Sequence, residues 1–179
     1  MTTASTLLYE LPIPMSPTTR RAGFADLYER HYEAVFRAAL RVTGNAADAE
    51  DALQTVFLRI VARGDAAAAL PAAYFKRAAV NAAVDVLRRR ELRAESAYDE
   101  GASQPGHVSQ SSVQPPVLLK ERLRRAIATL DSEDASLFVL RHIEGLTLDE
   151  LAGMFEIEKN NVAVRLHRIR RRLQAELER

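Results

Sequence analysis

The chain has 179 residues, a formal net charge of +1 and no cysteine. This length suits one medium-sized domain or two small ones. The absence of cysteine excludes a disulfide framework and a thiolate metal site, and it fits a reducing compartment. Apolar residues make up 47% and charged residues 27%, as in ordinary soluble globular proteins. Because the whole chain is almost neutral, any argument for nucleic-acid binding must rest on where the charge lies.

The N-terminal stretch "MTTASTLLYELPIPMSPTTRR" lacks a basic segment followed by an apolar block, so we expect no secretory signal. Its three prolines indicate a flexible extension over residues 1–20. No run of roughly 18 apolar residues, the length that spans a bilayer, occurs in the sequence. We therefore expect a cytoplasmic protein.

Helical spacing of apolar residues runs through residues 24–92 and predicts a first helical domain over 21–93. Gly44 is expected to end the first helix, and Asn45 to cap the second, with Asp48 in the capping-box position. Gly64 and Pro71 then interrupt the pattern before a long third helix. The apolar face of the second helix is predicted to hold Ala49, Leu53, Val56, Phe57 and Ile60.

Residues 94–116 change character, since serine, glutamine, glycine and proline replace the apolar period. A polar stretch of roughly twenty residues is long for a loop inside a compact domain. It predicts a flexible linker between two separately folded units.

The second unit, residues 117–179, again shows helical patterns and no run typical of a strand. Asp131 is expected to cap one helix, and Thr147 with Glu150 forms a capping box for a short one. A tight turn and a basic final helix follow. The predicted fold class is all-α, two small helical domains of which the C-terminal one carries a helix-turn-helix.

The final helix separates two kinds of side chain. Apolar residues recur at helical spacing and predict one buried stripe: Val162, Leu166, Ile169 and Leu173. The opposite face and its flanks carry amides, arginines and a histidine, which suit base edges and phosphates of a DNA major groove. These candidates are Lys159, Asn160, Asn161, Val164, Arg165, His167, Arg168 and Arg171. A coiled-coil or partner-binding basic helix is the alternative interpretation.

Two stretches of the first unit carry further patterns. In "DAEDALQTVFLRI", which starts at Asp48, an acidic ridge lies beside apolar residues, as for docking on a basic protein surface. A solvated helix face would look the same. In "AYFKRAAVNAAVDVLRRR", Asn81, Asp85 and Arg88 share one face, although Asp85 and Arg88 could simply form an ion pair.

These pieces and the polar linker, in this order, resemble bacterial RNA polymerase sigma factors of the extracytoplasmic-function (ECF) type in the sigma-70 superfamily. The resemblance covers roughly residues 24–92 and 118–173. It implies a protein that binds core RNA polymerase, recognises the minus-ten and minus-thirty-five promoter elements, and aids promoter melting. It also implies an anti-sigma factor, often membrane-attached, as a partner.

The resemblance implies roles for particular residues. Docking on core polymerase falls to Asp48, Asp51, Gln54 and Phe57. Contact with the minus-ten element falls to Arg63, Tyr74, Phe75, Lys76, Asn81, Asp85, Arg88 and Arg89, with a flipped base captured near residues 63–75. The candidates named on the final helix would read the minus-thirty-five element, and the linker would thread toward the active-site cleft of the polymerase.

Several positions depart from the pattern of the family, among them Ser132 and Glu133, where a proline pair is common, and Ala163, where a basic residue is frequent. Tyr74 stands where a tryptophan is usual, Glu156 where a glycine is common, and Glu158 where a serine often caps the final helix. Because Glu158 is a weak cap, we expect that helix to begin at Asn160 or Asn161.

Nothing in the sequence predicts an enzyme. The four histidines, His31, His107, His142 and His167, have no metal-ligand spacing, and no phosphate-binding glycine motif occurs. We expect no cofactor, metal or small-molecule substrate. Two alternatives to the sigma-factor interpretation are a stand-alone helix-turn-helix regulator and a helical adaptor that binds only protein.

Overall fold

The computed structural model describes residues 17–64, 69–99 and 115–178. Within these ranges the chain forms seven helices and no strand, which confirms the all-α fold class. None of the described helices is both long and apolar enough to cross a bilayer. The helices are α1 (Pro17–Thr43), α2 (Ala46–Ala62), α3 (Ala72–Asp99), α4 (Pro115–Ala128), α5 (Ser132–His142), α6 (Leu148–Phe155) and α7 (Lys159–Leu177).

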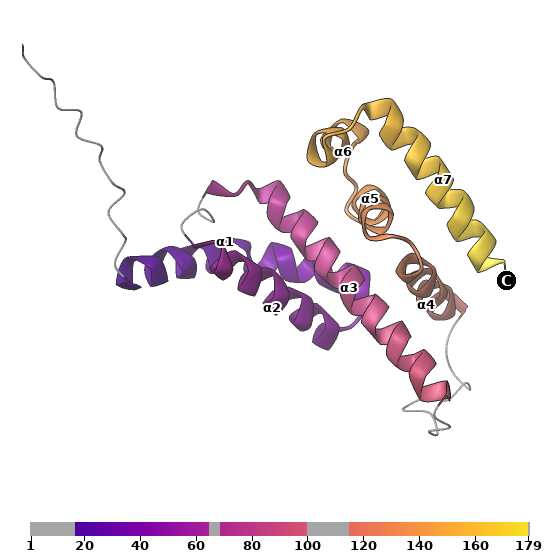
Figure 1. Cartoon of the computed structure of the whole chain (residues 1–179), viewed down its shortest axis with the longest axis horizontal. Coiled ribbons are helices and arrows are strands. Elements are labelled where there is room, and N and C mark those ends of the chain that lie inside the picture. Colours follow the sequence, from indigo (N-terminus) through magenta and orange to yellow (C-terminus); the bar gives the residue numbers. More distant parts are fainter. Residues whose placement is uncertain (1–16, 65–68, 100–114, 179) are drawn as a thin grey trace, which may run out of the picture.

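Helices α1, α2 and α3 pack on one another and form what we call the first unit (Figure 1). Gly44 ends α1 with φ 78°, and the Asn45 side chain caps α2 by accepting a hydrogen bond from the Asp48 backbone N–H at 2.8 Å. All five residues predicted for the apolar face of α2 are buried. The expected local signals therefore hold here.

The helix boundaries extend the predicted ones. Helix α1 begins at Pro17, inside the stretch 1–20 that we expected to be flexible, while residues 1–16 lie outside the described residues. Helix α3 continues to Asp99, past the predicted linker boundary, because 94–99 still include the strong helix formers Ala and Glu. Most of the predicted linker, residues 100–114, lies outside the described residues.

Helices α4 to α7 form the second unit, and their caps follow the sequence. The Asp131 side chain caps α5, and Thr147 and Glu150 form the complete capping box of α6. Glu156 ends α6 in the left-handed region with φ 55°, a conformation that glycine adopts more easily. Helix α7 begins at Lys159, earlier than expected, and Glu158 makes no side-chain capping hydrogen bond.

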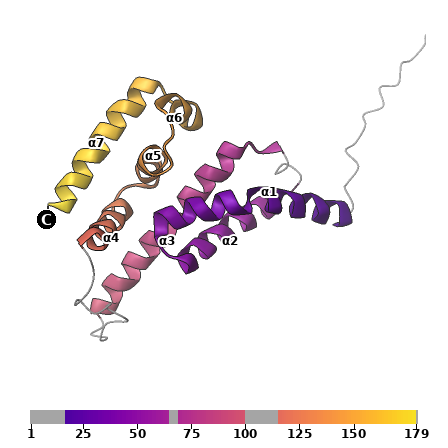
Figure 2. The same ribbon diagram turned by 180° about the vertical axis from the view of Figure 1, so that it is seen from behind.

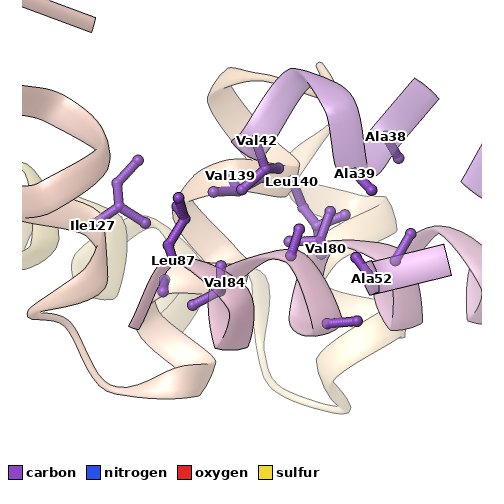
Figure 3. Close-up of a cluster of buried hydrophobic side chains, with 14 of the residues drawn as sticks. Ala38, Ala39, Val42, Ala52, Val80, Val84, Leu87, Ile127, Val139 and Leu140 are labelled. Carbon is purple, nitrogen blue, oxygen red and sulfur yellow. The ribbon is translucent and has the colours of Figure 1, made fainter. Parts of the chain in front are cut away.

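The second unit lies along one side of α3, with α7 farthest from it, while α1 and α2 cover the other side (Figures 1 and 2). Figure 3 shows apolar side chains of α4 and α5 beside those of α1 and α3: Ile127, Val139 and Leu140 next to Val42, Val80, Val84 and Leu87. The two units thus share one continuous core. The polar linker led us to expect two separately folded units. The composition of a linker does not reveal whether the surfaces of the two units that it connects fit together.

Candidate nucleic-acid and polymerase interface

Helix α7 has one buried face and one exposed face. The four residues of the predicted stripe, Val162, Leu166, Ile169 and Leu173, are all buried. The exposed side chains on the rest of the helix include most of the predicted DNA-reading set: Lys159, Asn160, Asn161, Val164, His167, Arg168 and Arg171. Val164 is 51% exposed although it is apolar. The helix therefore presents amides, cations and one small apolar group together, the side chains that discriminate base edges.

The arginines of α7 fall into two groups. Arg165 is half-buried, and its guanidinium contacts carboxylates at the start of α5, with Nη2 2.9 Å from Glu133 Oε2 and Nε 2.5 Å from Asp134 Oδ1. Burial disfavours its charge, but these hydrogen bonds outweigh that effect and raise the pKa of Arg165. Among the described residues no carboxylate pairs with Arg168 or Arg171, so these two guanidinium groups are available to a ligand.

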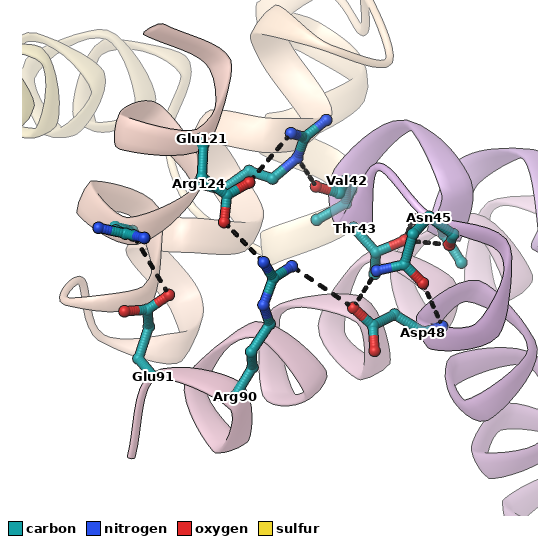
Figure 4. Close-up of polar contacts among 10 residues, drawn as sticks. Val42, Thr43, Asn45, Asp48, Arg90, Glu91, Glu121 and Arg124 are labelled. Carbon is teal, nitrogen blue, oxygen red and sulfur yellow. Dashed lines mark hydrogen bonds and ion pairs between the residues drawn. The ribbon is translucent and has the colours of Figure 1, made fainter. Parts of the chain in front are cut away.

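The predicted polymerase-docking residues on α2 divide in the same way. Asp51 and Gln54 are exposed, whereas Phe57 is buried and packs edge-on against Phe24 with ring centroids 6.1 Å apart. Asp48 is half-buried, and its Oδ2 lies 3.8 Å from Arg90 Nη1 (Figure 4). The described arrangement leaves Asp51 and Gln54 as the accessible members of this set.

Two apolar side chains complete the accessible face of α2. Leu58 is 69% exposed and Val61 is 55% exposed, and both lie at helical spacing from Asp51 and Gln54. The mixed acidic and apolar face of α2 is therefore made of Asp51, Gln54, Leu58 and Val61. Our site prediction omitted Leu58 and Val61, although both fall off the buried stripe that we had identified.

Aromatic and cationic side chains meet where α2 ends and α3 begins. The Arg63 guanidinium lies over the Tyr74 ring, 4.9 Å from its centroid. Phe75 is buried and stacks on His31 with ring centroids 3.8 Å apart, and burial lowers the pKa of His31. Arg63 and Tyr74 therefore offer a ring and a cation at the surface, whereas the Phe75 ring lies within the core. Residues 65–68 of the connecting segment lie outside the described residues.

The second unit covers part of the predicted minus-ten helix α3. The Asn81 side-chain oxygen contacts the buried hydroxyl of Ser136. Arg88 donates hydrogen bonds to the carbonyl oxygens of Ala128 and Leu130, the former at 3.3 Å. Asn81 and Arg88 are thus engaged by the protein itself in this arrangement.

Two other predicted residues of α3 remain nearer the surface. Asp85 lies 3.7 Å from both Arg59 Nη2 and Arg88 Nη1, so the ion pair that we considered at i, i+3 is present. Arg89 is exposed and donates to the Asp85 carbonyl at 3.3 Å. Apart from Arg63, which ends α2, the predicted minus-ten set lies on α3, where it is split between an open and a covered part.

Polar contacts also join the two units near the C-terminal end of α1. Arg90 Nη2 donates to Glu121 Oε1 at 2.9 Å, and Arg124 Nε donates to the Val42 carbonyl at 3.1 Å (Figure 4). The Arg124 guanidinium lies directly over Gly44, within 2.2–2.8 Å of where a Cβ would stand. Cations from both units thus contribute to the contact between them.

No cluster of three or more His, Asp or Glu side chains in the described part of the chain is arranged to hold a metal ion. His107 falls outside that part.

Comparison with known proteins finds matches over both units of the chain. The chain matches the families described as Sigma-70 region 2, over residues 27–93, and Sigma-70, region 4, over residues 120–173. It is 30% identical over 150 residues to the RNA polymerase sigma factor CarQ of Myxococcus xanthus, and the aligned region covers 82% of this chain and 84% of CarQ. It is 26% identical over 166 residues to the ECF RNA polymerase sigma factor SigW of Bacillus subtilis (strain 168), and the aligned region covers 87% of this chain and 89% of SigW.

A solved structure supports the fold. The structure of CnrH in complex with the cytosolic domain of CnrY superposes with a TM-score of 0.51 at 22% identity, over 90% of this chain and 91% of CnrH. Together these findings show that the chain belongs to the sigma-70 family of RNA polymerase sigma factors, in its ECF group. It is a promoter-recognising sigma factor, and the stand-alone regulator and the adaptor are not favoured. Sigma factors as a family are not enzymes.

Proposed function

We propose that three surfaces of this chain divide the work of transcription initiation. The face of α2 formed by Asp51, Gln54, Leu58 and Val61 docks on core RNA polymerase. Its exposed acidic and apolar groups would complement a basic partner surface with apolar pockets, and desolvated apolar anchors carry much of the energy in such contacts.

The minus-ten element is bound at the junction of α2 and α3. Tyr74, with the Arg63 guanidinium over its ring, is a platform for an unstacked base, because aromatic stacking is worth about 1–3 kcal/mol per base. Lys76, Asn81, Arg88 and Arg89 follow along α3 and would contact the backbone and melted strand. Asn81 and Arg88 serve this role only once the second unit leaves α3.

The minus-thirty-five element is read by α7 in the major groove. The observation that carries this proposal is the division of α7 into a buried apolar stripe and an exposed face, on which Arg168 and Arg171 pair with no carboxylate of the described residues. Arg165 is held by Asp134 and Glu133, so it positions the helix or reaches a phosphate after exchanging partners.

We also propose that the protein acts in the cytoplasm without enzymatic activity of its own, and that an anti-sigma factor controls it. The solved structure of CnrH, which has the same fold, contains the cytosolic domain of CnrY. Co-purification from the native cell tests this part, since recovery of polymerase without any further protein would count against a dedicated inhibitor.

The central experiment is promoter-specific transcription in vitro with core polymerase. Asp51→Arg should abolish initiation by blocking docking and leave binding of the full chain to upstream-element DNA unchanged. Glu29→Arg, a charge reversal on an exposed position of α1, is the matched control and should initiate normally. If Asp51→Arg initiated as well as wild type, the docking assignment would be wrong; initiation by core polymerase alone from the same promoter would remove the need for a sigma role.

A further inference from the structure

Two cations of the first unit hold one carboxylate of the second, and a third cation contacts the end of α6. Arg41, near the end of α1, holds Glu144 through two parallel hydrogen bonds, Nε to Oε1 and Nη2 to Oε2, each of 2.7 Å. Lys76 Nζ on α3 lies 3.8 Å from Glu144 Oε2. The Glu144 side chain is only 1% exposed, so the carboxylate is enclosed by these cations and by its surroundings.

Arg77, the neighbour of Lys76, makes the third contact. Its Nη1 donates to the Met154 carbonyl at 2.6 Å, and its guanidinium lies 4.3 Å from the centroid of the Phe155 ring. The turn after α5 and the end of α6 thus occupy all three cations at once. These contacts do not belong to the core of either unit, since each joins α1 or α3 to the second unit.

The cations are less buried than the carboxylate that they hold. The side chains of Arg41 and Lys76 are 48% and 42% exposed. A half-exposed guanidinium with its two donors aimed at one anion has the fork geometry that binds carboxylate and phosphate alike. The hydrogen bond to Glu144 also raises the pKa of Arg41, as expected for a guanidinium matched to an anion.

We propose that Arg41, Lys76 and Arg77 form a binding site for DNA backbone phosphates, and that Glu144 and the end of α6 occupy this site while the two units are packed together. The inference rests on the proposed promoter-binding function and extends it to Arg41 and Arg77, which the site prediction did not contain. Lys76 connects the new site to the Tyr74 platform, two residues away in α3. The Glu144 carboxylate stands in for the phosphate that a bound strand would supply.

The same packing covers Asn81 and Arg88 on the adjacent stretch of α3. A strand that lies along α3 therefore meets the second unit at each of these positions. DNA and the second unit compete for one surface, and Glu144 is the group through which the competition is most directly tested.

The test measures binding of the full chain to a labelled single-stranded DNA of mixed sequence, as a function of salt concentration. Glu144→Gln keeps the side-chain volume but removes the charge that occupies Arg41 and Lys76. Each cation that newly contacts a phosphate steepens the slope of log K against log salt by about 0.7 for single strands, so two cations should steepen it by about 1.4. Glu33→Gln is the matched control, because Glu33 pairs with Arg37 on the exposed side of α1 and its loss changes the net charge equally.

A double variant separates release of the units from phosphate binding. Glu144→Gln with Arg41→Gln should keep the packing loosened but return about 0.7 of the gained slope, since one phosphate contact is lost. Because the chain contains no cysteine, Ala25→Cys and Ala175→Cys provide two unique dye positions on α1 and α7, both exposed. Glu144→Gln and the double variant should both increase the dye-to-dye separation relative to wild type. Circular dichroism is used to check that both keep the helical content of the wild type.

The outcomes distinguish this inference from the proposed function. A steeper slope in Glu144→Gln that Arg41→Gln partly reverses supports the phosphate site. An unchanged slope in Glu144→Gln, with binding of duplex upstream-element DNA still dependent on Arg168, overturns the phosphate site and leaves the proposed function standing. Failure of every variant to bind either DNA overturns both.

Discussion

Replacing Arg168 with alanine should weaken binding to the upstream promoter element without affecting stability. The side chain is exposed and pairs with no described carboxylate, so the free energy of unfolding should change by no more than about 0.5 kcal/mol. Loss of a bidentate contact to a guanine edge costs about 1–3 kcal/mol, which is roughly a 5-fold to 140-fold increase in Kd. Arg168→Lys keeps the charge but not the fork, and should recover little of that loss if Arg168 reads a base.

Arg165→Ala should behave in the opposite way. Its removal takes from Asp134, whose side chain is 14% exposed, the nearer of its two guanidinium partners and leaves only Arg172, whose Nη1 lies 3.5 Å from Asp134 Oδ2. We expect this to cost about 1 kcal/mol in the free energy of unfolding. Both variants are compared by urea unfolding and by fluorescence anisotropy on a duplex selected by the wild-type protein, at one fixed salt concentration.

The contrast between the two arginines is the decisive result. Arg168→Ala that unfolds at lower urea than wild type would refute the view that this side chain is free. Arg165→Ala that is fully stable but binds DNA as weakly as Arg168→Ala would show that both arginines read DNA directly.

Three further predictions concern local structure. Thr147→Ala breaks the capping box of α6 and should destabilise the protein by about 1 kcal/mol in urea unfolding. Thr55→Ala is the control and should be almost neutral, because it removes only a hydroxyl that donates to the Asp51 carbonyl within α2. Equal losses of stability in the two variants would contradict the role of the cap. Gly44→Ala places a Cβ at a residue with φ 78° and against Arg124, and should cost about 1–2 kcal/mol in stability. Gly153→Ala, inside α6 with open space around it, should stabilise the protein by about 0.5–1 kcal/mol. A lower melting temperature for Gly153→Ala than for Gly44→Ala would refute both expectations. Because burial lowers the pKa of His31, the unfolded state binds more protons than the folded state, and stability should fall as pH drops below about 6.5. His31→Gln should reduce this loss of stability at low pH. Urea unfolding with the same pH dependence in His31→Gln as in wild type would contradict this role of His31.

Local signals in the sequence predicted the local structure well. The stripe of α7 was read directly from the spacing of Val162, Leu166, Ile169 and Leu173, because only one face of a helix can meet the core. The caps at Asn45, Asp131 and Thr147 were readable for the same reason, since capping depends on residues three positions apart.

Contacts between distant segments could not be predicted in this way. Arg41 and Glu144 are 103 positions apart, and neither belongs to a motif that would link them. The same limit explains why the accessible face of α2 was only partly identified. Phe57 and Leu58 are adjacent apolar residues, and only the packing of α1 shows that the first is inside and the second outside.

The core shared by the two units makes their contact sensitive to temperature. Parting α3 from α4 and α5 would expose apolar side chains such as Leu87, Ile127 and Val139 to water, which increases the heat capacity. The apolar part of this cohesion weakens on cooling. Cooling should therefore weaken the apolar part of the contact that covers Asn81 and Arg88 on α3.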